Sequence, residues 1–134
     1  MTYSKAMLDA YPKDLSIDKR MVQNCIDACF DCAQACTACA DACLSEEMVA
    51  ELIGCVSTDL DCADLCVTTG RILSRHTGVD ARFSRSVLEA CATACKICGD
   101  ECLSHAEMHE HCRICAEACR RCEAACRELL KSLG

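Results

Sequence analysis

Cysteine recurs at helical spacing along most of this chain. The 18 cysteines fall into four groups, and from Cys25 to Cys43 the intervals are 4, 3, 4, 3 and 4 residues. At about 100° per residue, the six side chains of that group lie within an arc of roughly 80° on one face of a helix. The other groups repeat the pattern, so four helices each carry a stripe of thiols: Cys25, Cys29, Cys32, Cys36, Cys39 and Cys43; Cys55, Cys62 and Cys66; Cys91, Cys95, Cys98 and Cys102; Cys112, Cys115, Cys119, Cys122 and Cys126.

Large apolar side chains are scarce. Leu, Ile, Val and Phe together supply 26 of 134 residues, and at about 19% of the chain this is a level at which sequences begin to look disordered. The strong periodicity argues for order instead, because a protonated cysteine behaves as a small buried hydrophobe. The 19 alanines allow close contact between helices. We therefore expect the thiol stripes to face a shared core within one domain.

Four long helices joined by short connections are expected over residues 17–44, 45–74, 84–103 and 104–133. Serine is a favoured N-cap residue, and one serine stands at the start of each: Ser16, Ser45, Ser84 and Ser104, the last in an S-x-x-E capping box with Glu107. Short connections place consecutive helices antiparallel. The predicted fold is all-α, an up-down-up-down four-helix bundle with a cysteine-lined core over residues 16–134. Residues 1–15 form a separate N-terminal segment, with a short helix ahead of Pro12 that either packs across the bundle or frays.

The thiols need a compartment that keeps them reduced. Residues 1–19 lack an apolar segment, a twin arginine and a small-residue cleavage site, so they do not read as a secretory signal. No stretch approaches the 18 or so apolar residues that span a membrane. A disulfide scaffold is the other interpretation of a cysteine-rich chain, but it belongs to short, loop-rich secreted domains. We expect a cytoplasmic protein with reduced cysteines.

Thiolates are soft ligands that select Cu(I), Zn(II) or iron-sulfur clusters. Residues four apart on a helix have Cβ atoms about 5–6 Å apart, and two sulfurs on a linear metal ion span roughly 4.6 Å, taking the zinc-sulfur bond as a guide. A C-x-x-x-C pair on a helix fits that span. Zinc sites are usually closed by loops that this chain does not supply. Iron-sulfur motifs depend on looped backbone and a following proline, whereas the only proline here is Pro12.

The charge left in the core after metal binding distinguishes these metals more firmly than the geometry of the sites. If each thiol exchanges one proton for one Cu(I) ion, the core stays neutral throughout loading. Four tetrahedral Zn(II) ions in the same core would leave about ten uncompensated thiolate charges if all the cysteines were ionised, and burying unpaired charge is strongly unfavourable. Zinc could occupy four sites with the other thiols protonated, but it could not use all 18 cysteines. The four cysteine stripes therefore indicate that each monomer binds many Cu(I) ions.

The ladders of Cys25 to Cys43, Cys91 to Cys102 and Cys112 to Cys126, on four helices without a leader, resemble the bacterial copper storage proteins, in particular their cytosolic branch. The resemblance covers about residues 16–133. It implies a homotetramer of four-helix bundles, each core filled by many Cu(I) ions bound mainly by pairs of cysteine sulfurs. It also implies a role in copper storage, copper homeostasis and protection from copper toxicity.

The two ends of the expected bundle differ. Near Cys25, Cys66, Cys91 and Cys126 the stripes continue into an apolar plug formed by Met21, Leu73, Leu88, Leu129 and Leu130. At the other end, which we call the mouth, they continue into thioether and imidazole groups that could capture copper and pass it inward: Met48, His105, Met108 and His109. The alternative is core filling for the two methionines and a surface role for the two histidines. His76 and His111 lie off the stripes and are expected to be solvated.

Asp59 lies on the second stripe, between Cys55 and Cys62, where an ordinary core residue would be apolar. It is a candidate oxygen ligand or a polar partner of the thiols. The candidate metal ligands are therefore the 18 cysteines together with Met48, His105, Met108, His109 and Asp59.

Three classes of function fit the pattern to different degrees. Copper storage explains all the cysteines. A module that senses or delivers zinc or copper needs only a few exposed sites. A thiol redox enzyme would place C-x-x-C at the start of a helix after a strand, and no strand pattern is present. The net charge of −7 argues against nucleic acid as a partner. No nucleophile, base and orienting group stand together, so we expect no catalysis.

Overall fold

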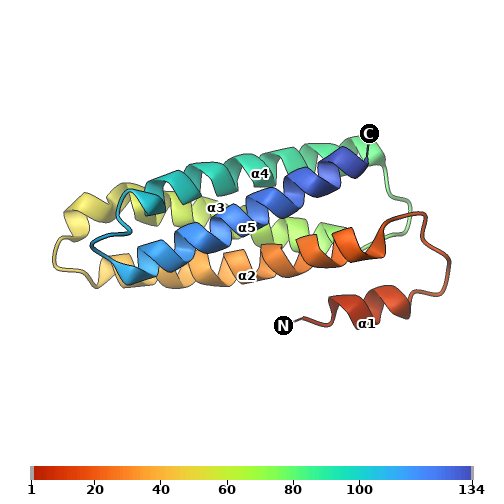
Figure 1. The fold of residues 1–134 in the computed structure, drawn as a ribbon, viewed down its shortest axis with the longest axis horizontal. Helices are drawn as coiled ribbons and strands as arrows, with labels where there is room; N and C mark the ends of the chain where they lie inside the picture. The colour runs from red at the N-terminus through yellow and green to blue at the C-terminus, as the bar shows by residue number, and fades with distance from the viewer. Residues whose placement is uncertain (1, 134) are drawn as a thin grey trace.

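The computed structural model describes residues 2–133, and every regular element in that range is helical. In chain order the elements are α1 (Ser4–Asp9), α2 (Lys19–Leu44), the 3₁₀ helix η1 (Val49–Leu52), α3 (Ile53–Leu73), α4 (Ala81–Leu103) and α5 (Glu110–Ser132) (Figure 1). The fold is all-α, as the stripes predicted. None of the helices in residues 2–133 combines the length and the apolar character needed to cross a bilayer.

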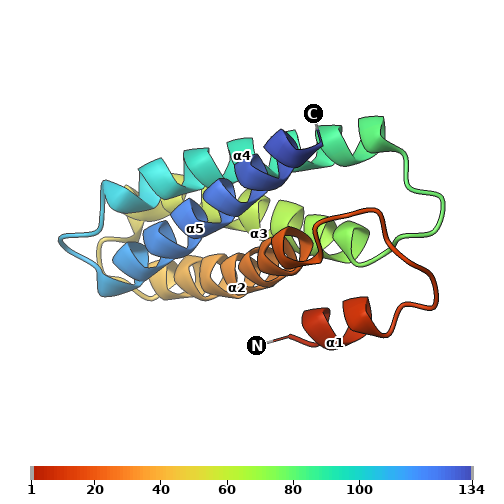
Figure 2. The ribbon, with the colours of Figure 1, turned by 45° about the vertical axis from the view of Figure 1, so that its right-hand side comes forward.

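The four long helices form an antiparallel bundle. Helix α2 packs against α3 and α5, and α4 packs against the same two helices, so the four close into a ring around one core. Figures 1 and 2 show the consecutive helices running in alternating directions. The α2–α3 and α4–α5 connections meet at one end, which is the mouth. The α3–α4 connection and the end of α5 lie at the opposite end.

Two helices begin at an aspartate rather than at the expected serine. The side chain of Asp18 accepts a hydrogen bond from the backbone of Met21 at 3.1 Å and caps α2. Asp80 accepts from the backbone of Arg82 at 2.8 Å and caps α4. The predicted caps Ser16 and Ser84 were therefore wrong. Extended backbone at both aspartates sets the boundary and leaves the carboxylate free to reach the first turn.

The connections at the mouth are longer than predicted. Ser45 ends α2 as its C-cap, and a turn followed by η1 precedes α3. Ser104 likewise ends α4, so the predicted capping box with Glu107 does not start a helix. Helix α5 begins only at Glu110, after His109. Reversing the chain between two antiparallel helices requires several residues outside both, and these serines lie in that reversal.

The N-terminal segment packs on α2. Leu8 of α1 is buried, and the Ser4 hydroxyl donates to the carboxylate of Asp27 at 2.7 Å. The chain then passes the α3–α4 connection, where the hydroxyls of Tyr11 and Thr77 lie 3.1 Å apart. The short helix predicted ahead of Pro12 is thus present, and it packs on α2 alone rather than across the bundle.

Helices α2 and α3 approach closely at Gly70. A Cβ atom there would lie 2.8 Å from the ring of Phe30 on α2. Because that distance is far inside van der Waals contact, only glycine fits without displacing the ring. The absence of a side chain at Gly70 lets the two helices come near enough for their thiol stripes to meet.

Candidate metal centre

All 18 cysteines point into the core. Each is buried and none is in a disulfide within residues 2–133. Helix α2 contributes six, α3 three, α4 four and α5 five. The residues between them on the inward faces are small, such as Ala28, Ala33 and Ala92. The spacing that predicted the stripes therefore produces one column of sulfur along the bundle axis.

The sulfurs approach one another across helices as well as along them. The Sγ atoms of Cys36 and Cys119 lie 3.6 Å apart, those of Cys55 and Cys102 3.5 Å, and those of Cys25 and Cys126 3.8 Å. These separations are somewhat shorter than the roughly 4.6 Å that two sulfurs span on a linear metal ion. Small rotations of the side chains would open the pairs enough to admit an ion.

The sulfurs fall into overlapping groups. Ligand atoms within each group all lie within 4.8 Å of one another, and neighbouring groups share members: Cys29, Cys91, Cys122 and Cys126; Cys32, Cys66, Cys95 and Cys122; Cys32, Cys36, Cys62 and Cys119; Cys36, Cys98, Cys115 and Cys119. Cys122, Cys32, Cys36 and Cys119 each belong to two of these groups. The column is thus continuous, without the gaps that separate isolated tetrahedral sites.

Burial favours the protonated form of two thiols near the mouth, Cys43 and Cys112. It raises the pKa of Cys43 to about 11, and the neighbouring thiolate charge of Cys39 adds to the effect. Burial also raises the pKa of Cys112, with further repulsion from Cys39. A metal ion that binds at Cys43 or Cys112 must therefore displace a proton.

Asp59 is the one buried carboxyl group of the column in residues 2–133. Its Oδ1 accepts hydrogen bonds from the thiols of Cys98 at 3.0 Å, Cys115 at 3.1 Å and Cys102 at 3.3 Å. Burial, followed by its contact with Cys98, raises the pKa of Asp59 to about 9. In the metal-free protein Asp59 is a polar partner of the thiols, and its role as an oxygen ligand stays a prediction.

His111 lies against the sulfur column at the mouth. Its Nδ1 is 3.4 Å from the sulfur of Cys39 and 3.7 Å from that of Cys112. His111, Cys39, Cys43 and Cys112 together form a further group of potential ligands. The expectation that His111 is solvated was therefore wrong. A helical projection places it beside the stripe, whereas in the structure its ring contacts Cys39 and Cys112 of the column.

The other mouth residues differ in their positions. His109 is buried, and its Nδ1 lies 2.9 Å from a carboxylate oxygen of Glu46. His105 is partly buried, with its Nε2 3.4 Å from Glu101. Met48 is partly buried ahead of η1. Met108 is 66% exposed in the α4–α5 connection, so the helical stripe that was expected to carry it inward does not extend that far.

The opposite end is closed by apolar side chains. Leu73, Leu88 and Leu129 are buried, while Met21 and Leu130 are partly buried against the core. The plug predicted at this end is therefore present. His76, also expected to be solvated, is partly buried, and its ring packs edge-on against Tyr11 with 5.4 Å between the ring centroids. No sulfur column continues past the leucines within the described residues.

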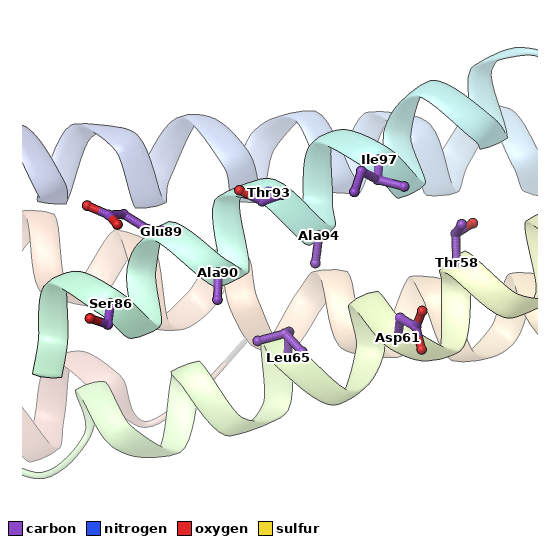
Figure 3. Close-up of a pocket in the computed structure, with 9 residues that line it drawn as sticks. All are labelled: Thr58, Asp61, Leu65, Ser86, Glu89, Ala90, Thr93, Ala94 and Ile97. Atoms are coloured by element: carbon purple, nitrogen blue, oxygen red, sulfur yellow. The ribbon is translucent and has the colours of Figure 1, made fainter.

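A hollow of about 520 Å³ runs along the outside of the bundle between α3 and α4. Figure 3 shows Ala90 and Ala94 of α4 facing Leu65 and Asp61 of α3 across it. None of the residues that line it is a cysteine or a histidine. It is therefore separate from the metal centre, which lies inside the ring of helices.

A four-helix bundle whose core holds 18 free thiols belongs to the class of proteins that bind many thiophilic metal ions. The comparisons with known proteins place it within that class. A sequence profile of the copper storage protein family matches residues 18–131, and the chain belongs to this family.

Similar proteins occur in Streptomyces and in Bacillus. The copper storage protein Ccsp from Streptomyces lividans, in a structure loaded with 10 copper equivalents, is 60% identical, with a TM-score of 0.94 over 96% of this chain and 98% of that one. Metal-free copper storage protein 3 from Bacillus subtilis is 35% identical, with a TM-score of 0.69 over 81% of this chain and 97% of that one. An uncharacterized cysteine-rich protein of Bacillus subtilis, YhjQ, is 38% identical over 94 residues, or 70% of this chain and 82% of the relative.

Proposed function

We propose that this protein stores Cu(I) in the column of cysteine sulfurs. The observation that carries the proposal is the overlap of the four-sulfur groups, because the sulfurs that they share join neighbouring groups into a chain of potential binding sites along the core. Monovalent copper suits thiols that pair across 3.5–3.9 Å and that need one proton displaced for each ion gained. The store serves copper homeostasis and protection from copper toxicity.

The ligand set we propose is the 18 cysteines, with His111 added at the outermost group. His111 Nδ1 lies 3.4 Å from the sulfur of Cys39 and 3.7 Å from that of Cys112. His105 and His109 serve capture at the mouth, where residues 44–56 and 100–112 contain no lysine or arginine. The negative potential of such a segment attracts cations. Met48 and Asp59 remain candidate ligands, while Met108 is exposed and placed only for a first encounter.

Further properties follow from the family. A five-copper structure of the Streptomyces lividans relative describes it as a cytosolic copper storage protein, which supports a cytoplasmic location here. We propose no catalytic activity. A homotetramer is implied by the family resemblance, and Leu60, Val67 and Ile97 supply exposed apolar surface on α3 and α4 for such an assembly. Light scattering on the purified protein measures the assembly directly.

Titration of the fully reduced, metal-free protein with Cu(I) against a coloured Cu(I) chelator tests the proposed function. We expect binding in about a one-to-one ratio to the cysteines, and far fewer Zn(II) ions under the same conditions. Saturation at four or fewer Cu(I) ions per monomer would eliminate storage and favour a sensing or delivery module.

A further inference from the structure

Glu46 connects two histidines of the mouth. It lies one residue after the C-cap of α2, and its backbone N–H donates to the carbonyl of Cys43 at 3.2 Å. One carboxylate oxygen, Oε2, accepts a hydrogen bond from Nε2 of His111 at 2.8 Å. The same oxygen lies 2.9 Å from Nδ1 of His109. A single carboxylate, tied through its backbone to a cysteine of the column, therefore contacts both imidazoles.

The contact determines which nitrogen of His111 is available. An ionised carboxylate can only accept hydrogen bonds, so the nitrogen that faces it must carry the proton. With Nε2 protonated, the neutral ring has its lone pair on Nδ1. That nitrogen is the one directed at the sulfurs of Cys39 and Cys112. The hydrogen bond thus presents the metal-binding nitrogen of His111 to the thiols.

The orientation of the ring is restrained from two sides. The imidazoles of His109 and His111 are stacked, with 5.6 Å between their centroids and 28° between their planes. The His109 side chain is 8% exposed and that of His111 26%. Rotation of His111 about its side-chain torsions would break the bond to Glu46 and the stacking together. A histidine on an open surface has neither a carboxylate partner nor a stacked ring to fix its orientation.

We propose that Glu46 is a positioning residue for copper, which holds His111 in the tautomer and orientation that complete the outermost site with Cys39, Cys43 and Cys112. The inference rests on the proposed copper-binding function. Carboxylates that orient a ligating histidine through its second nitrogen typically change metal affinity by about 10–100-fold. Glu46 itself needs no bond to the metal for this effect.

The test compares Glu46→Ala, Glu46→Gln and His111→Ala with the matched control Glu47→Ala, which removes an exposed carboxylate from the same turn. Histidine ring nitrogens are followed by long-range proton–nitrogen NMR at about pH 8.5, where an ordinary imidazole is neutral. In the wild type and the control, Nε2 of His111 should be protonated and Nδ1 unprotonated, and Nδ1 should shift when copper saturates the protein. In Glu46→Ala the metal-free ring should show both tautomers.

Chelator competition on the same proteins supplies the energetic readout. Glu46→Ala should weaken the copper ions held at the mouth by about 10–100-fold, while total capacity falls by no more than one or two ions. Glu46→Gln keeps an oxygen acceptor at the same place, so it should restore most of the tautomer preference and affinity. In a His111→Ala background, Glu46→Ala should cause no further loss of copper affinity.

Some results would overturn the inference. One is that Glu46→Ala leaves both the His111 tautomer and the copper affinity unchanged. The other is that Glu46→Ala lowers the copper affinity equally in the wild-type and His111→Ala backgrounds. Either would show that Glu46 does not act through that ring. Because total capacity is measured in the same titration, failure of the storage function itself is recognised separately, as saturation at a few ions in the wild type.

Discussion

Replacing Asp59 by asparagine is expected to stabilise the metal-free protein, and to do so increasingly as the pH rises. Asp59 is fully buried, and burial raises its pKa from 3.8 to about 9. Between these two values the unfolded chain releases the proton while the folded protein keeps it. The free energy of unfolding therefore falls with each unit by which the pH rises. Asparagine has nearly the same shape and no proton to release.

The pH window and the magnitude follow from the two pKa values. One unit corresponds to about 1.36 kcal/mol, so the interval from pH 5 to pH 8 corresponds to at most about 4 kcal/mol. Solvent relaxation around the carboxyl reduces this figure, and we expect the variant to gain about 2–4 kcal/mol on the wild type over that interval. Below pH 3.8 the carboxyl is protonated in both states, and above about pH 9 it is ionised in both, so the difference is constant outside these limits.

The assay is urea unfolding of reduced, metal-free protein under anaerobic conditions, followed by circular dichroism at several pH values. The cysteines are the same in both proteins, so subtraction removes most of their contribution. Asp61→Asn, at an exposed position on the same helix, is the matched control. A stability difference that does not change with pH, or a wild type that gains on the variant as the pH rises, would show that Asp59 is ionised in the folded protein.

Four further outcomes are expected. The metal-free reduced protein should already be helical by circular dichroism, because protonated cysteines form an apolar core, and copper should raise its melting temperature by binding the native state; a chain that folds only with copper would refute this. Alanine at both His105 and His109 should slow copper uptake in stopped-flow mixing while capacity falls by only a few ions; uptake that is unchanged there but faster in plug variants would place the uptake route at the leucine end. Leu88→Ala removes a fully buried plug side chain and should lower the free energy of unfolding by about 2–5 kcal/mol, as measured by urea titration; no loss would mean that the plug is not packed. Gly70→Ala places a Cβ 2.8 Å from the Phe30 ring and should cost about 1–3 kcal/mol in the same titration, whereas a neutral result would mean that the ring moves freely.

The sequence predicts the bundle well because one residue type carries the pattern. Intervals of three and four cysteines determine a helical face, and the same face is the one that four helices bury together. The plug leucines follow from the same stripes extended by one or two turns. These features depend only on periodicity within a helix, which a single chain displays directly.

The mouth was predicted less well because it depends on contacts between elements. Whether Asp18 or Ser16 caps α2 is determined by where the backbone becomes extended, and both residues are good caps. His111 lies beside its stripe in projection, and its contacts with Cys39 on α2 and with Glu46 depend on how α2 and α5 pack together. Glu46 belongs to no helical repeat at all. Its position depends on how the turn after α2 packs against α5. Glu46 and His111, which meet there, are 65 residues apart in the sequence.

Burial of every sulfur has a consequence for the protein before any copper arrives. Oxidants attack thiolates that they can reach, whereas protonated, enclosed thiols react slowly. A core cysteine such as Cys36 has no exposed surface, so peroxide has no approach to it while the bundle stays closed. The packing of the bundle itself should therefore slow oxidation of the metal-free thiols.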